Sequence, residues 1–427
     1  MQNKMQWVGI SPLIFISSLI IGLSINGSIN MDLNSKLFSG LPDPKPIFSF
    51  PIVFGGITLF FVLYTLISLL VEMFRTDYIL LETLGANRFH ISFLVGSQIS
   101  IISLTISFIS YIFSIPFTQG YYYFLQYFFG ENLLPDVHFS LSFIGLVVTV
   151  FLTSLIVFLS GFHYTMKEMK PKSTSKIKIL KKIILMILIG VPWSLILIKI
   201  FENPSISIRT QMLFYLTIFN IAIIYQISPY IQSLFLRLIS SLFIRYKYMY
   251  IISKWNLLFN RRYVKSVSAA IISIITLITS FQLISQNILY KTQEDANLEL
   301  IVALIVYMGA PILIVFANII SIALLSMNKE KTDIQNIEIL GASRSQLVLI
   351  KLGEATLLTI IISTISLIIN LLFCFLLVIF INDISLKSLN YAGLYQPNFV
   401  VSIIIFCLLF LSKSCYLILK TKFQVYS

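Results

Sequence analysis

The sequence predicts an all-α polytopic membrane protein with about ten transmembrane helices, and its composition and its apolar runs are the observations behind that fold class. Of the 427 residues, 58% are hydrophobic and 11% are charged, and the mean hydropathy is +0.94. A soluble domain with this composition would expose a very large apolar surface. A helix that crosses a bilayer core about 30 Å thick needs roughly 20 apolar residues, and the chain contains ten runs long enough for this.

The ten runs follow one another along the whole chain. The first begins directly after MQNKMQW, is too long for a removable signal peptide and has no small-residue cleavage site behind it. We therefore predict that it remains in the membrane as a helix. The predicted membrane helices are 8–28, 52–74, 92–117, 141–165, 181–201, 210–230, 264–288, 300–327, 346–381 and 397–419.

The distribution of Lys and Arg predicts the orientation of these helices, because loops rich in these residues stay in the cytoplasm. With the N-terminus inside, the inner loops hold 24 of the 30 Lys and Arg residues and the outer loops hold 6. The sequence therefore predicts a multi-pass protein of the cell (plasma) membrane with both termini in the cytoplasm.

The net charge of +13 does not indicate a nucleic-acid partner. The basic residues are spread through inner loops beside apolar helices, where they fix the topology and contact anionic membrane lipid. Cys374, Cys407 and Cys415 fall inside predicted helices without CxxC spacing, so we expect neither a disulfide framework nor a metal site.

One short phrase occurs twice in the chain. Residues 75–88, the first repeat segment, read RTDYILLETLGANR, and residues 331–344, the second repeat segment, read KTDIQNIEILGASR. They share seven of fourteen aligned residues at an offset of 256. Each copy follows one long apolar run on the predicted cytoplasmic side and leads into the next run. The copies therefore occupy equivalent places in two parallel repeats.

Each repeat segment is predicted to begin as a short amphipathic helix on the cytoplasmic face. Thr76 and Thr332 are the expected N-caps of these helices, and Thr332 has Gln335 at the spacing of a capping box. The expected apolar sides consist of Ile79, Leu80 and Leu84 in the first segment and Ile334, Ile337 and Leu340 in the second.

Each predicted helix ends at a glycine. Gly85 and Gly341 stand where a C-terminal cap favours a left-handed residue. Asn87 and Ser343 are expected to cap the helix that follows, and Ser343 has Gln346 at the spacing of a capping box. The result would be a stiff connection that transmits a push from a soluble partner into the two helices that it joins.

The two segments resemble the cytoplasmic motif of FtsX-like (MacB-type) ABC transporter permeases, in which glutamate, x, leucine, glycine, alanine, x, arginine follows the second helix of a four-helix unit. The matching residues are Glu82, Leu84, Gly85, Ala86 and Arg88 in the first copy and Glu338, Leu340, Gly341, Ala342 and Arg344 in the second. The stretch WNLLFNRRYVKSVSAAI, residues 255–271, is similar to the basic elbow before the first helix of such a unit. The resemblance covers 1–165 and 250–420.

The resemblance implies a tandem, 4+2+4 arrangement of helices. Residues 1–165 would form the first FtsX-like four-helix unit, and residues 250–427 the second. Residues 166–249 would form a two-helix linker with basic inner loops, including a run led by Pro229 that lies along the inner surface.

The resemblance also implies a permease subunit whose ATPase is a separate cytoplasmic polypeptide. The sequence contains no G-x-x-x-x-G-K-[ST] loop, so we expect no enzyme and no cofactor in this chain, with ATP and Mg²⁺ on the partner. Two docking segments in one chain predict two ATPase subunits per permease. The expected docking residues are Arg75, Thr76, Asp77, Glu82, Leu84, Gly85, Ala86, Arg88, Lys331, Thr332, Asp333, Glu338, Leu340, Gly341, Ala342 and Arg344.

The chain departs from the family in its short outer loops. Family members usually carry a large domain outside the membrane, whereas the predicted loops here are only 29–51 and 289–299, too short to bury a core. A lipid-like or hydrophobic peptide substrate, moved within or extracted from the bilayer, fits this chain better than an external lever.

Two other classes of function stay open. An ion-gradient-driven secondary transporter would also be polytopic with internal repeats, although its sites would carry intramembrane carboxylates. A membrane signal-relay protein would use the same rigid connections without moving a substrate. An intramembrane enzyme is disfavoured, because no paired Asp, clustered His or GxSG-type nucleophile occurs in the predicted helices.

Several polar and aromatic residues have a structural and a functional interpretation. Polar groups within apolar runs can mark a substrate path but more often join helices, and we expect the helix-joining role here. These residues are Glu72 and Glu354, close to inner helix ends, and Gln98, Asn220, Asn318 and Asn370, deeper in the runs. The aromatic run Tyr121–Phe129, expected in an outer loop, could bind lipid or simply lie at the interface. Glu294, Asp295 and Glu299 are expected to be a solvated helix cap rather than a cation site.

Overall fold

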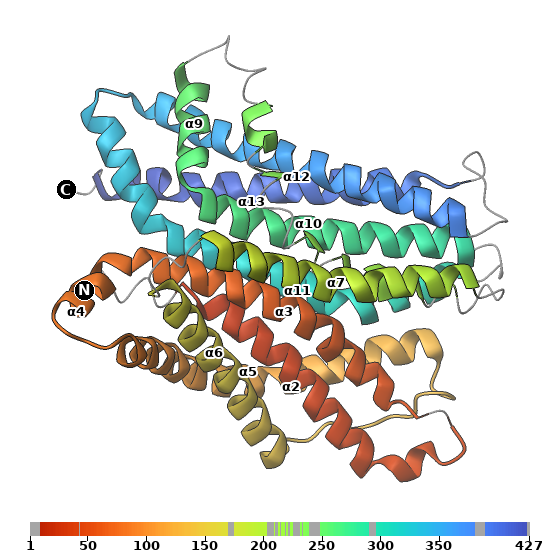
Figure 1. Cartoon of the computed structure of the whole chain (residues 1–427). Helices are drawn as coiled ribbons and strands as arrows, with labels where there is room; N and C mark the ends of the chain where they lie inside the picture. The colour runs from red at the N-terminus through yellow and green to blue at the C-terminus, as the bar shows by residue number, and fades with distance from the viewer. Residues whose placement is uncertain are drawn as a thin grey trace. The chain divides into compact units, whose positions relative to one another are not determined.

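The structure is a computed structural model that describes residues 9–41, 43–169, 175–202, 248–289, 296–380 and 389–424, together with scattered residues between 209 and 238. Every regular element within these residues is a helix (Figure 1). The elements in chain order are α2 (Ser11–Leu33), η1 (Ser35–Phe38), α3 (Lys45–Met73), α4 (Arg75–Thr83), α5 (Arg88–Phe129), α6 (Phe143–Glu168), α7 (Ser175–Glu202), α9 (Tyr248–Phe259), α10 (Arg261–Ile284), the π-helix η2 (Ser285–Leu289), α11 (Ala296–Ile339), α12 (Arg344–Phe380) and α13 (Ala392–Gln424).

Seven helices in the described part of the chain are long and apolar enough to cross a membrane. They are Ser11–Leu33, Arg88–Phe129, Phe143–Lys167, Val267–Asn287, Ile305–Leu325, Arg344–Ile379 and Ala392–Leu411. These segments overlap seven of the ten predicted runs, which confirms an all-α, multi-pass membrane protein. The run at 52–74 is helical in α3, with Val62–Met73 as a shorter apolar stretch, and the run at 181–201 is helical in α7. The run at 210–230 and the segment led by Pro229 lie largely outside the described residues.

Several helices extend beyond the apolar runs that predicted them. α5 has 42 residues and is therefore about 63 Å long at 1.5 Å per residue. Its last turns include Tyr121–Phe129, so the prediction that this aromatic run is a loop is wrong. No Gly or Pro interrupts residues 121–129, and α5 ends only at Gly130, which has a φ of +82°. The predicted outer loop 29–51 is likewise shorter, because α2 continues to Leu33 and α3 begins at Lys45.

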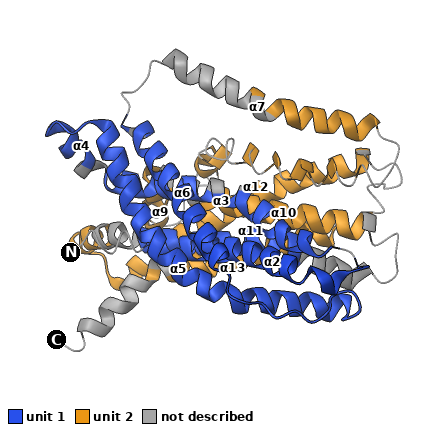
Figure 2. Cartoon of the chain, turned by 90° about the horizontal axis from the view of Figure 1, so that it is seen from below, with its two compact units in different colours: residues 1–171, 295–325 blue, residues 172–294, 326–427 orange. Residues whose placement is uncertain are grey.

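The chain divides into two compact units (Figure 2). Unit 1 consists of Met1–Pro171 and Asp295–Leu325, and unit 2 consists of Lys172–Glu294 and Ser326–Ser427. The first part of α11 therefore belongs to unit 1 and its last turns belong to unit 2. The division into 1–165, 166–249 and 250–427 follows the sequence repeat and stays a prediction.

Unit 1 is built around α2, which packs against α3, α5 and α6. Small side chains of α5 allow close helix contacts, since Ser110 Oγ donates to the carbonyl of Phe15 at 2.6 Å. Gly27 of α2 lies against the ring of Phe48, where any Cβ atom would come within 2.1 Å of a ring carbon. On α11, the Oγ atom of Ser321 accepts the N–H of Leu13 at 3.1 Å.

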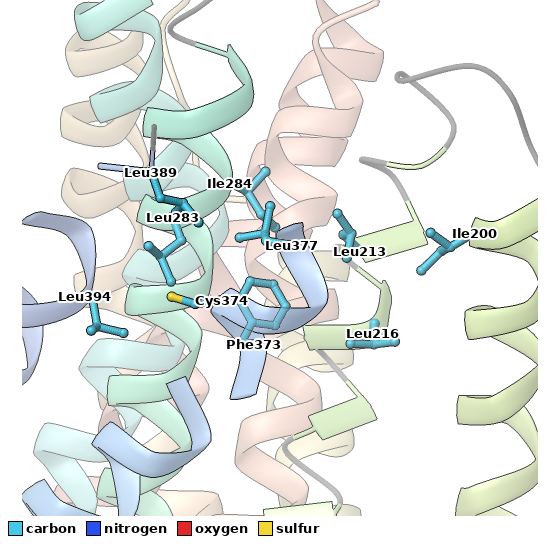
Figure 3. Packing of buried hydrophobic residues seen from close by; sticks show 10 residues of the cluster. All are labelled: Ile200, Leu213, Leu216, Leu283, Ile284, Phe373, Cys374, Leu377, Leu389 and Leu394. Carbon is cyan, nitrogen blue, oxygen red and sulfur yellow. The ribbon is translucent and has the colours of Figure 1, made fainter. Parts of the chain in front are cut away.

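Unit 2 is built around α10, which packs against α12 and α13. Leu283 and Ile284 of α10 lie in one buried apolar cluster with Phe373, Cys374 and Leu377 of α12 (Figure 3). The five-residue π-helix η2 continues α10 beyond this cluster. The cluster fixes the rotation of α10 and α12 about their axes relative to each other.

Candidate functional site

The first repeat segment forms helix α4 and the turn after it. Leu84 ends the helix and Gly85 follows with a φ of +93°. The N–H of Gly85 donates to the carbonyl of Glu82 at 3.1 Å, and the N–H of Ala86 donates to that of Leu81 at 3.0 Å. These are the two hydrogen bonds of a Schellman motif, so the predicted glycine cap is confirmed.

The second repeat segment ends in the same turn. Gly341 has a φ of +91°. Its N–H donates to the carbonyl of Glu338 at 2.9 Å, and the N–H of Ala342 donates to that of Ile337 at 3.3 Å. Both repeat segments therefore end in the same backbone turn, and the residues of the two turns correspond at the offset of 256 that relates the sequences.

The predicted caps of the following helices are present. Asn87 Oδ1 accepts the N–H of Phe89 at 3.4 Å at the start of α5. Gln346 Oε1 accepts the N–H of Ser343 at 2.8 Å at the start of α12, which is one of the two hydrogen bonds of a capping box. Each helix after a repeat segment thus begins at a defined residue.

The predicted N-caps of the repeat segments are wrong. α4 begins at Arg75, one residue before Thr76, and no side chain caps it. Thr332 lies inside α11, which continues without a break to Ile339 because residues 312–340 contain no Gly or Pro. The break in the first copy occurs at Phe74, which is buried, and this residue has no aromatic counterpart in the second copy.

The two segments are also buried in the same way. Residues 78–87 and 334–343 pass through the same order of buried, half-buried and exposed positions at ten successive residues. The buried anchors are Tyr78 and Ile334, which are 6% and 0% exposed. Since these two anchors differ in type, the shared pattern reflects the backbone geometry rather than identical side chains.

Apolar side chains at the tip of each turn are exposed. Leu84 is 74% exposed and Leu340 is 85% exposed, and Ile339 beside it is 83% exposed. Of the residues predicted for the apolar sides, Ile334 is buried and Ile337 is half-buried. The exposed ones are Ile79, Leu80, Leu84 and Leu340. Exposed leucines next to a charged turn are available for contact with another protein or with the membrane surface.

A salt bridge spans the first turn. Arg88 Nε lies 3.0 Å from Glu82 Oε1, and both side chains are partly exposed. Such a pair adds little stability, but it ties α4 to the start of α5. Glu338 and Arg344 have the same spacing in the second copy. The structure places Arg75, Thr76 and Asp77 in the first turn of α4, and Lys331, Thr332 and Asp333 inside α11.

A polar network connects α12 to α9, just beyond the second repeat segment. Ser253 Oγ donates to the carbonyl of Ile350 at 2.8 Å, and Asn256 Nδ2 donates to Glu354 Oε1 at 3.0 Å. Lys351 Nζ lies 3.2 Å from the same carboxylate oxygen, and both charged side chains are 3% exposed. The helix-joining role expected for Glu354 is confirmed, and its charged partner Lys351 was missed. The same expectation is wrong for the side chains of Asn318 and Asn370, whose amide atoms have no hydrogen-bond partner.

Sequence reasoning also missed an asparagine in α2 that holds the connection between α5 and α6. Asn30 is 1% exposed. Its Nδ2 donates to the carbonyls of Asn26 at 2.9 Å and Ser140 at 3.2 Å, and its Oδ1 accepts the N–H of Ser140 at 3.0 Å. One amide thus joins its own helix to the residue that leads into α6.

Asn287 of η2 makes the corresponding contacts in unit 2. Its Nδ2 donates to the carbonyls of Leu283 at 2.9 Å and Asn390 at 3.5 Å, and its Oδ1 accepts the N–H of Asn390 at 2.8 Å. We call these two residues the asparagine clamps. The sequence showed only a polar residue near the end of α2 and another near the end of α10. Neither asparagine lies in the repeat segments.

Replacement of Asn30 by leucine is expected to lower the unfolding temperature of the purified chain in detergent. The substitution leaves the N–H of Ser140 without its partner, which costs about 1–3 kcal/mol. The matched control is Ser28→Ala, because the hydroxyl of Ser28 donates only to Ser24 in the same helix. Equal unfolding temperatures for the two variants would show that the clamp does not stabilise unit 1.

No group of three or more His, Cys, Asp or Glu residues that could hold a metal ion occurs among the residues that the structure describes. Glu294 and Asp295, two of the three acidic residues considered as a helix cap, lie outside those residues. The chain was compared with protein-family models, with curated proteins and with solved structures, and none of them matches.

Proposed function

We propose that the chain is the permease subunit of an ABC transporter of the FtsX-like (MacB) type, and that its two repeat segments receive the ATPase subunits. The observation that carries this proposal is the pair of identical Schellman turns at Gly85 and Gly341, with matching burial over ten residues. A turn that only reverses the chain needs no such agreement in backbone, burial and sequence.

The chemistry of each turn fits docking of a soluble partner. The exposed Leu84 and Leu340 offer apolar contacts, and Glu82 and Glu338 offer charge that selects the partner's orientation. The two Schellman bonds leave little freedom in the backbone. A push on the turn therefore moves the helices on both sides of it rather than bending the connection.

The proposal includes a 4+2+4 arrangement of ten membrane helices in the cell membrane, with both termini in the cytoplasm. One chain would bind two ATPase subunits, one at each repeat segment. ATP and Mg²⁺ would be bound by those subunits, and the permease would move or extract a lipid-like or hydrophobic peptide substrate. A complex with two permease chains for each pair of ATPase subunits would contradict this stoichiometry.

The double substitution Glu82→Lys and Glu338→Lys tests the proposal. We expect the variant to lose most co-purification with the ATPase subunit from its own host, at least tenfold, because charge reversal at a docking surface is strongly unfavourable. Affinity purification in mild detergent followed by mass spectrometry measures this loss. The control is Glu131→Lys, which alters an exposed carboxylate outside both repeat segments.

Two outcomes would contradict the proposal. One is the double variant retaining its ATPase partner at the normal ratio. The other is the unaltered chain purifying without any protein that contains a phosphate-binding loop, after which an ion-gradient carrier or a signal-relay protein becomes the better hypothesis. In the carrier reading, Glu354 would be the first candidate for ion coupling, although it already pairs with Lys351.

A further inference from the structure

One end of unit 2 contains buried polar atoms that have no hydrogen-bond partner. They are Oγ1 of Thr279, Oε1 of Gln282, Oγ of Ser285 and Oε1 of Gln286 along α10 and η2, and both side-chain amide atoms of Asn370 on α12. We call these five residues the polar cluster. Unpaired polar groups are costly inside a membrane, where no water replaces the partner.

The two glutamines of the polar cluster face the start of α13. A Cβ atom at Gly393 would lie 2.8 Å from Gln286 Oε1 and 3.3 Å from the Cβ atom of Gln282. Glycine at this position therefore allows α13 to approach both side chains. The approach places Gln286 Oε1 at the first turn of α13, next to the Cβ atom of Gln282.

Asn370 reaches the same level from α12. Ser366 Oγ donates to Asn398 Oδ1 at 2.9 Å, which sets the rotation of α12 against α13. These helices run antiparallel. A residue one turn after Ser366 in α12 therefore lies beside a residue one turn before Asn398 in α13. Asn370 is therefore level with Leu394, which packs in the same cluster as Cys374 (Figure 3).

Unit 1 provides an internal comparison for the polar cluster. The clamps Asn30 and Asn287 align α2 with α10 at an offset of 257, and the repeat segments align α5 with α12 at 256. At these offsets the two glutamines correspond to isoleucines. The five corresponding residues are Gly22, Ile25, Ser28, Ile29 and Ser114.

None of these five residues, all in the described part of unit 1, contributes an unpaired buried polar atom, although α2 has such atoms at two other positions, Ser24 Oγ and Asn26 Nδ2. Ser28 Oγ donates to the carbonyl of Ser24 at 2.8 Å, and Ser114 Oγ donates to that of Tyr111 at 2.7 Å. The same helix arrangement therefore packs without glutamines. Their presence in unit 2 calls for a role other than packing.

The position and charge of the polar cluster indicate its ligand. Gln286 lies one residue from the end of the membrane span Val267–Asn287, and Gly393 is the second residue of the span Ala392–Leu411. Lipid headgroups meet acyl chains at this level. The surrounding segments, residues 276–289, 366–380 and 389–402, contain no Asp, Glu, Lys or Arg.

We propose that the polar cluster binds the uncharged, hydroxyl-bearing headgroup of a membrane lipid. Carboxamide and hydroxyl side chains both donate and accept hydrogen bonds, as sugar or glycerol hydroxyls do. The interruption of α10 by a π-helix fits this role, since π turns occur frequently at functional sites. The proposal goes beyond the transport function, because the chain binds this lipid without its ATPase.

The test uses the full chain in phosphatidylcholine nanodiscs, whose bulk headgroup has no hydroxyl, with a small fraction of glucosyl-diacylglycerol or of 3-acetyl-diacylglycerol with the same acyl chains. Native mass spectrometry of the released protein counts the retained lipid. We expect one glucosyl lipid per chain and no enrichment of the acetylated lipid, which is uncharged but has no hydroxyl. The double variant Gln282→Ile and Gln286→Ile, which installs the residues of unit 1, is expected to retain the glucosyl lipid about tenfold less well through loss of two hydrogen bonds.

Two further variants make the test decisive. Thr276→Val removes a buried hydroxyl of α10 that already donates to Ser273 at 2.8 Å, and it is expected to leave retention unchanged. Asn370→Ser installs the residue of unit 1 on α12 and should weaken retention independently. Full retention by a folded double-isoleucine variant would overturn the proposal, as would equal retention of both lipids by the unaltered chain.

Discussion

If the proposed docking function holds, valine at Gly85 and Gly341 is expected to uncouple the chain from the proposed ATPase subunits while leaving it in the membrane. Both glycines have a φ above +90°, where a β-branched residue is strained by about 1–3 kcal/mol. A Cβ atom at either position would meet nothing within 4 Å. The effect therefore comes from the backbone alone, and the Schellman turn opens without a steric clash in the protein.

Two measurements check this prediction. Amide hydrogen exchange at Ala86 and Ala342 is expected to accelerate about tenfold, because each N–H loses its partner in the turn. ATP hydrolysis by the purified complex should fall to the rate of the ATPase subunit alone. Normal hydrolysis with accelerated exchange would show that the turns do not transmit force.

Two controls separate backbone strain from other effects of the substitution. Asparagine tolerates the left-handed region, so Gly85→Asn and Gly341→Asn should retain most of the coupling. Gly120→Val adds the same side chain to α5, at a glycine that also has open space around its Cβ position and no positive φ. This variant is expected to behave like the unaltered chain.

Replacement of Lys351 by methionine is expected to have the largest effect on stability. In the unaltered chain the ammonium group of Lys351 lies 3.2 Å from the buried carboxylate of Glu354. The substitution removes this ammonium group and leaves the carboxylate buried. Breaking one side of a buried ion pair typically costs 3–5 kcal/mol, which is roughly 10²- to 10³-fold or more in the folding equilibrium. The unfolding temperature in detergent measures this loss.

The double variant Lys351→Met and Glu354→Gln should recover much of the lost stability. Glutamine keeps an oxygen that can accept the hydrogen bond from Asn256 Nδ2, and it carries no charge that requires a partner. Lys254→Met, on the half-buried side of α9, is the matched control with an expected change below about 0.5 kcal/mol. A single Lys351→Met variant as stable as this control would show that water reaches Glu354.

Features that depend on neighbouring residues were predictable from the sequence. Seven apolar runs are membrane-crossing helices because the bilayer requires length and hydrophobicity from each segment alone. Gly85 and Gly341 form the predicted caps, since only a few residue types adopt a positive φ. The Thr332 cap failed because capping preference is weak when nothing interrupts the preceding helix.

Features that depend on distant residues were not predictable. Asn30 binds the backbone of Ser140, 110 positions away, and nothing in the local sequence of either residue indicates the other. Lys351 falls at the start of the predicted helix 346–381, and nothing in that stretch of sequence showed that it is buried against Glu354. In both cases the partner is chosen by the packing of helices, which a single sequence does not encode in a readable pattern.

The division of α11 between the two units determines the order in which the protein can be completed during synthesis. Unit 1 needs residues 295–325, and the hydrogen bond from the N–H of Leu13 to Ser321 spans 308 positions. The ribosome must therefore make most of the polypeptide before the first unit has all its parts. Domains usually fold from the N-terminus as they emerge from the ribosome. In this chain the first helices of unit 1 are made long before α11, which they need to complete their packing.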